Sequence, residues 1–264
     1  MLITLLLPTS GSARVLGYDV VADASAVRRR IGYVFGGDRG LYERLPAIDN
    51  LRYFAELYGI DPARRRARID ELLDMVGLRG RERERVEGYS RGMRQRLHIA
   101  RGMLHDPPVL FLDEPTIGVD PVGARDLRDL IAGLTAAGKT VLLTTHYMFE
   151  ADALCDRIAV IAQGRIVAEG TPQTLKRRVA DRAVVEIETF GVDGSTVARI
   201  EDVATVSSVS VEERGQAQIV SVQASNGAEI AGEILALLGS VRVGRVTTRE
   251  PTLEDAYVAL VTES

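Results

Sequence analysis

The stretch Val109–Pro115, which reads VLFLDEP, decides the fold. It is an apolar run bordered by Pro107-Pro108 on one side and by an acidic pair on the other, which is typical of a buried strand. In an open parallel sheet, ligands bind outside the carboxyl ends of the strands. Asp113 and Glu114 stand at that end, where one carboxylate can face a hydrated cation and the other a water molecule. For such a pair taken alone, an acidic turn after a core strand is the alternative interpretation.

Two further patterns flank this strand. Upstream, residues 89–96 contain a serine and a glycine and lead into a helical pattern that continues to Leu104. Free backbone N–H groups at a helix start, together with the helix dipole, favour a bound anion there. Downstream, Gly118–Pro121 is followed by an apolar strand, Thr140–Thr145, which ends at His146.

In this order the motifs resemble the nucleotide-binding domain of ATP-binding cassette (ABC) transporters. The signature motif of that family, LSGGQ, corresponds to residues 89–93. Ser90 and Gly92 match the motif, whereas Arg91 and Met93 depart from it. The resemblance implies that these four positions bind nucleotide, and that Ser90 and Gly92 reach the nucleotide held by the opposite subunit.

The same resemblance assigns roles to the other motifs. The Walker B strand ends at Asp113, which would hold Mg²⁺ through water, and Glu114 would be the catalytic carboxylate that polarises the attacking water. The D-loop of the family corresponds to Gly118–Asp120 and supplies Asp120 as a further nucleotide-binding residue. His146 corresponds to the switch histidine, which contacts the γ-phosphate. The implied cofactors are ATP and Mg²⁺.

Two parts of the family pattern are altered or missing. The family places a glutamine after the strand predicted at residues 31–35, and Gly36 aligns with it; glycine cannot ligate Mg²⁺, and Asp38 is a candidate substitute. In the family, a Pro-Thr-Ser-Gly turn like that at residues 8–11 follows the helix that opens with the Walker A loop. By this resemblance Met1 lies inside that helix, and the chain is truncated before its Walker A loop. We therefore expect the chain as given to lack ATPase activity.

The sequence contains a GKT at Gly138-Lys139-Thr140. A phosphate loop follows a strand and opens a helix, so that the helix N–H groups point at the phosphates. This GKT instead ends a predicted helix and enters a predicted strand. Gly138 is therefore predicted to terminate a helix rather than to bind phosphate.

We expect an α/β, P-loop NTPase-like ABC ATPase core over residues 1–182, with a helical subdomain inserted at about 46–105, where apolar residues recur at helical spacing. From residue 183 the pattern changes to short alternating segments and three helical stretches, the last of which begins near Pro251. This order is similar to a split βαββαβ unit and predicts a small C-terminal α+β, ferredoxin-like domain over 183–264. Such folds host many functions, so this domain predicts none by itself.

Composition limits the classes of partner. The formal net charge of the 264 residues is −4, which is not the basic footprint of a nucleic-acid-binding protein. The single cysteine, Cys155, excludes an internal disulfide and is typical of a reducing compartment. No apolar run approaches the ~20 residues of a membrane span. A transport role therefore requires a separate transmembrane permease subunit.

The motifs are also similar to those of the ATP subunits of bacterial exporters of the drug-resistance and polyketide-antibiotic type. This resemblance implies ATP hydrolysis that is coupled to domain closure. It implies two partners, a permease and a second ATPase subunit in a homodimer or heterodimer, and a cytoplasmic location on the inner face of the cell membrane. Two alternatives stay open: a noncatalytic half-site subunit that completes a partner's ATP site, and a nucleic-acid or ribosome-associated ABC protein. The nucleic-acid or ribosome-associated alternative is disfavoured because such proteins commonly carry two cassettes or a long inserted coiled coil, and this sequence shows neither pattern.

Overall fold

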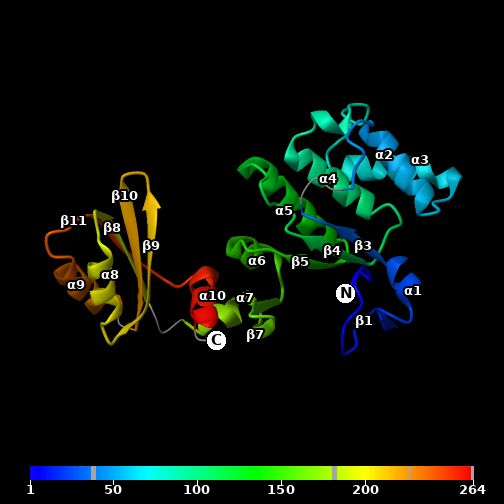
Figure 1. Cartoon of the computed structure of the whole chain (residues 1–264). Coiled ribbons are helices and arrows are strands. Elements are labelled where there is room, and N and C mark those ends of the chain that lie inside the picture. Colours follow the sequence, from blue (N-terminus) through cyan, green and yellow to red (C-terminus); the bar gives the residue numbers. More distant parts are fainter. Residues whose placement is uncertain (37–39, 180–182, 226, 263–264) are drawn as a thin grey trace. The chain divides into compact units, whose positions relative to one another are not determined.

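The structure is a computed structural model that describes residues 1–36, 40–179, 183–225 and 227–262. It divides into two compact units, Met1–His146 and Tyr147–Ser264 (Figure 1). Asp38, the candidate substitute for the family glutamine, lies outside the described residues. The domain boundary predicted between residues 182 and 183 stays a prediction.

The first unit combines a parallel sheet with helices. Helices occupy the stretch where apolar residues recur at helical spacing, as predicted. The elements of this unit are β1 (Arg14–Val15), β2 (Tyr18–Asp19), α1 (Ala24–Arg28), β3 (Ile31–Val34), α2 (Ala47–Leu57), α3 (Pro62–Met75), the 3₁₀ helix η1 (Val86–Gly88), α4 (Arg91–Gly102), β4 (Val109–Asp113), α5 (Pro121–Ala136) and β5 (Thr140–Thr144).

The parallel sheet has the order β3-β4-β5, with β4 in the centre. Ile31 pairs with Val109, and Val109 pairs with Thr140, so neighbouring strands end at the same edge of the sheet. Leu110 is fully buried, as expected for a strand that is covered on both faces. The predicted buried strand is confirmed, and Asp113 lies at its exposed end.

Residues 1–7 form turns, which corrects the prediction that the chain starts inside a helix. The N–H of Thr4 donates to the carbonyl of Met1 at 2.8 Å, and Thr4 has a φ of 63°, which is outside the helical region. Pro8 also disfavours a helical conformation at Leu7.

The GKT segment is a helix end, as predicted. Gly138 has a φ of 85°, and its N–H donates to the carbonyl of Thr135 at 2.9 Å. The N–H of Lys139 donates to the carbonyl of Leu134 at 3.1 Å, which completes the termination of α5. The Lys139 ammonium lies 2.7 Å from Asp106 Oδ1, so this lysine is paired with a carboxylate.

The second unit contains a hairpin, a four-stranded sheet and helices. Among the described residues of the chain, no helix has the length and apolar character that a membrane span requires. The elements of this unit are α6 (Met148–Leu154), β6 (Ile158–Ala162), β7 (Arg165–Gly170), α7 (Pro172–Arg177), β8 (Ala183–Phe190), α8 (Gly194–Glu201), β9 (Val206–Arg214), β10 (Ala217–Ala224), α9 (Gly227–Leu238), β11 (Arg242–Arg249) and α10 (Leu253–Thr262).

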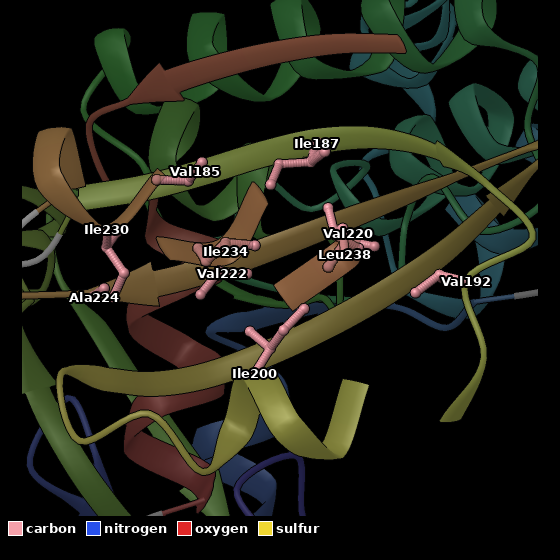
Figure 2. Close-up of a cluster of buried hydrophobic side chains, with 10 residues drawn as sticks. All are labelled: Val185, Ile187, Val192, Ile200, Val220, Val222, Ala224, Ile230, Ile234 and Leu238. Atoms are coloured by element: carbon pink, nitrogen blue, oxygen red, sulfur yellow. The ribbon is translucent and has the colours of Figure 1, made fainter. Parts of the chain in front are cut away.

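The four-stranded sheet has the order β11-β8-β10-β9, and its neighbouring strands are antiparallel. With α8 and α9 it gives the βαββαβ order that the sequence predicts. Figure 2 shows its core, in which Val185 and Ile187 of β8 and Val222 of β10 gather with Ile200 of α8 and Ile234 of α9. Alternating apolar residues on the strands therefore bury one face of the sheet under the two helices.

The last helix, α10, packs against α6 and α7. Leu253 is 3% exposed and belongs to a cluster with Ala151 and Leu175. The start of α10 is held by Asp255, whose carboxylate accepts from the N–H of Thr252 at 2.7 Å and is paired with Arg249. Asp255 in turn raises the pKa of the Arg249 guanidinium, so this pair stays charged at neutral pH.

Candidate functional site

The carboxyl ends of β4 and β5 bring two acidic side chains, a hydroxyl and an imidazole together. Asp113 pairs with Thr144 across the parallel strands, and the Thr144 hydroxyl donates to Asp113 Oδ1. His146 Nδ1 lies 2.8 Å from Glu114 Oε2. The structure thus places the predicted Asp113, Glu114 and His146 in one site. Thr144 is a member that sequence reasoning did not single out; its register against Asp113 is what identifies it.

Glu114 has an unusual backbone conformation. Its φ is 46°, in the left-handed region that is uncommon for a residue other than glycine. Its N–H donates to the carbonyl of Thr144 at 3.0 Å, and its own carbonyl accepts from the N–H of Ile117 at 3.2 Å. These bonds hold the chain in a conformation that costs energy locally, and such residues cluster at functional sites.

Gly36 contributes space rather than a ligand. A Cβ atom at this position would lie 2.9 Å from the carbonyl oxygen of Asp113 and 3.1 Å from Glu114 Cβ. Only a glycine allows the segment after β3 to approach the acidic pair this closely. The structure therefore places Gly36 beside the backbone of Asp113 and Glu114, and its predicted nucleotide-binding role stays a prediction.

The acidic pair fits the metal and water half of a nucleotide site. Mg²⁺ takes oxygen ligands and is usually held by one or two carboxylates together with phosphate oxygens and water. Asp113 offers one exposed carboxylate, and the described residues contain no group of three or more acidic, histidine or cysteine side chains that could hold a metal alone. A bound Mg²⁺ would therefore need oxygens from the nucleotide.

The phosphate half of such a site is incomplete in the described residues. Beside Asp113 lies a hollow of about 280 Å³, and its walls include the apolar side chains of Phe35, Phe111 and Leu142. Phosphate binding needs backbone N–H groups at a helix start. The lining of this hollow is largely apolar strand, so it does not supply that cradle.

The signature segment starts α4. Ser90 is the N-terminal capping residue, and its Oγ accepts from the N–H of Met93 at 3.2 Å. The serine oxygen therefore satisfies one of the backbone N–H groups that the sequence predicts to be free for an anion at this helix start. The Arg91 guanidinium is directed to the D-loop, where its Nη1 donates to the carbonyl of Gly118 at 3.4 Å.

The signature segment and the D-loop pack closely. A Cβ at Gly92 would lie 3.2 Å from Val119 Cγ1, and a Cβ at Gly118 would lie 1.8 Å from Arg91 Nη1. Asp120 caps α5, because its Oδ1 accepts from two backbone N–H groups of the first turn, at 2.9 and 3.1 Å. These contacts fix the start of α4 against the start of α5.

The predicted site residues thus fall into two groups in the same unit. The strand-end group consists of Gly36, Asp113, Glu114 and His146, and the helix-start group consists of Ser90, Arg91, Gly92, Met93 and Asp120.

Similarity to known proteins identifies the family of this chain. A family model described as ABC transporter matches residues 1–117. The daunorubicin resistance ATP-binding protein DrrA3 of Streptomyces coeruleorubidus is 40% identical over 263 residues, which cover 98% of this chain and 81% of that protein. The chain belongs to the ATP-binding subunits of ABC transporters. Members of this family bind ATP, usually with Mg²⁺, and work with transmembrane permease partners.

Two further comparisons support this ABC assignment. The doxorubicin resistance ATP-binding protein DrrA of Mycobacterium tuberculosis strain H37Rv is 35% identical over 271 residues, covering 100% of this chain and 80% of that protein. The solved structure of cbiO1 from Clostridium perfringens, described as part of the ABC transporter complex cbiONQ, matches with a TM-score of 0.61 and 25% identity. It covers 67% of this chain and 75% of that chain. The predicted α/β ABC ATPase fold is confirmed.

Proposed function

We propose that this chain is the ATP-hydrolysing subunit that drives an exporter of drugs or antibiotics. The observation that carries the proposal is the 2.8 Å contact between His146 Nδ1 and Glu114 Oε2, beside the exposed carboxylate of Asp113. The names of the two resistance proteins support the cargo class. The partners are a separate permease and a second ATPase subunit, which place the chain at the inner face of the membrane.

Asp113, Glu114 and His146 of the strand-end group, together with Thr144, each have a role in this proposal. With its proton on Nδ1, His146 donates to Glu114 Oε2 and fixes the carboxylate, so that Oε1 can accept a proton from the attacking water. Thr144 fixes the Asp113 carboxylate by its hydrogen bond. Asp113 would hold Mg²⁺ through water, and the metal supplies neutralisation of phosphate charge. Positioning and electrostatics account for most catalysis of phosphoryl transfer.

The phosphate loop decides whether this chain acts alone. We define a loop-bearing form as this chain preceded by a strand and a G-x-x-x-x-G-K-[ST] loop from an intact ABC ATP-binding subunit. The loop-bearing form should hydrolyse ATP in a Mg²⁺-dependent reaction, whereas the chain as given should not. Hydrolysis by the chain as given, or none by a folded loop-bearing form, would contradict the proposal.

A second candidate function is a noncatalytic half-site. The packed helix-start group favours it, because Ser90 and Gly92 can complete a nucleotide site on a partner even where this chain binds no nucleotide. This candidate predicts that mixing the chain with its loop-bearing form preserves about one ATP-hydrolysing site per mixed dimer.

Ser90→Arg in the chain without the loop should remove that ATP-hydrolysing site, since a bulky cation would fill the place of the phosphate contact. Equal activity of the two mixtures would refute the half-site.

A further inference from the structure

A cavity lies between the end of α3 and the side of α5, within the first unit. Its volume is about 540 Å³, inside the ~300–1,000 Å³ range of small-molecule sites. Met75 at the end of α3 and Leu130 and Leu134 on α5 give it apolar walls. A Cβ placed at Gly133 would meet no atom within 4 Å, so this glycine leaves room where a larger residue would fill the cavity.

The charged residues of this cavity are Arg96, Asp126 and Asp129. The Arg96 guanidinium is already engaged, because its Nη1 donates to the carbonyl of Val76 at 3.4 Å and lies 3.9 Å from Asp126 Oδ2. Within the part of the chain that the structure describes, the Asp129 carboxylate has no hydrogen bond or ion pair. Two carboxylates against one engaged guanidinium leave the cavity negative.

Two helix ends add to this negative potential. α3 ends at Met75, and α5 ends at Ala136, directly before Ala137, which lines the cavity. The carboxyl end of a helix carries a partial negative charge that attracts cations within its last turn. The apolar walls and the negative edge therefore complement a ligand that combines an apolar body with a positive charge.

We propose that this cavity binds an amphipathic organic cation, with its apolar ring system against Met75, Leu130 and Leu134 and its charge beside Asp129. None of the residues that line the cavity belongs to the strand-end group or the helix-start group. The proposal therefore stands independently of the proposed ATPase function.

The test titrates the whole chain with 9-aminoacridine, a planar aromatic cation near neutral pH, and follows the fluorescence of the ligand. Acridine, which has the same ring system and is neutral there, is the matched probe. We expect saturable binding of 9-aminoacridine and weaker binding of acridine. Equal affinities for the two probes, or no saturable binding of the cation, would overturn the proposal.

Two variants locate the site. Gly133→Leu should abolish saturable binding, because the leucine fills the cavity; its side chain enters open space, so the fold is retained. Asp129→Asn should weaken 9-aminoacridine binding by ~2–5-fold, as for a partly exposed ion pair, and leave acridine binding unchanged. Glu233→Gln removes an exposed carboxylate of α9 and is the matched control. Circular dichroism confirms folding, and wild-type affinity in a folded Gly133→Leu variant would refute the site.

Discussion

Thr144→Val tests whether the strand-end hydroxyl fixes the acidic pair. Valine keeps the shape of the side chain and removes the hydroxyl. The hydroxyl donates to Asp113 Oδ1, and it also accepts a weaker hydrogen bond from the N–H of Glu114 at 3.3 Å. A hydrogen bond to a charged group contributes about 1.5–3 kcal/mol when it is shielded from water. Because Asp113 and Thr144 are both exposed, we expect the loss of stability to fall below this range, at about 1 kcal/mol. This corresponds to a ~5-fold shift in the unfolding equilibrium.

Urea denaturation of the chain measures this loss, with Thr144→Ser as the variant that keeps the hydroxyl. Thr140→Val is the matched control, since Thr140 is an exposed threonine at the other end of β5. In the loop-bearing form, Thr144→Val should also raise the Mg²⁺ concentration that ATP hydrolysis requires, because the Asp113 carboxylate loses its fixed orientation. If Thr144→Val and Thr144→Ser were equally stable and equally Mg²⁺-dependent, the role assigned to the hydroxyl would be wrong.

Three further predictions concern stability. Burial lowers the pKa of His105 in the folded state below its ordinary value of about 6.5. The free energy of unfolding should therefore fall as the pH drops below about 6.5, because the unfolded chain then binds a proton more readily than the folded one. His105→Gln should make the unfolding free energy less dependent on pH in this range, as measured by urea denaturation. Asn50 is fully buried and bonds both the N–H and the carbonyl of Tyr42, at 2.7 and 3.0 Å, so Asn50→Ala should cost roughly 2–4 kcal/mol of unfolding free energy, and a cost near zero would refute its bonding role. Gly118→Ala should cost about 1–2 kcal/mol for its φ of 67°, with an added penalty that Arg91→Ala relieves in a double-mutant cycle.

The sequence predicts those parts of the fold that depend on local pattern. The strand before Asp113 follows from a continuous apolar run between prolines and acidic residues, and the βαββαβ order follows from alternating and helical spacing. The termination of α5 was predictable from Gly138, because a glycine before a strand commonly ends a helix. Each of these features is decided by neighbours in the chain.

The parts that sequence reasoning missed depend on tertiary packing. The bond from Thr144 to Asp113 follows from the register of β5 against β4, which no local pattern of β5 fixes. The direction of the Arg91 side chain depends on the space left by Gly118 in another segment. Residues 1–7 form turns rather than the predicted helix because Thr4 has a positive φ and Pro8 disfavours a helical conformation at Leu7.

The measurement that tests the central claim most directly compares ATP turnover with ATP binding in the Glu114→Gln variant of the loop-bearing form. Glutamine keeps the shape of the side chain and removes the base that His146 orients at 2.8 Å. Turnover should fall by ~10²–10⁴, the usual contribution of a positioned general base, while the dissociation constant for ATP stays unchanged. An equal loss of binding and turnover would assign Glu114 a structural role, and unchanged turnover would contradict its role as the catalytic carboxylate.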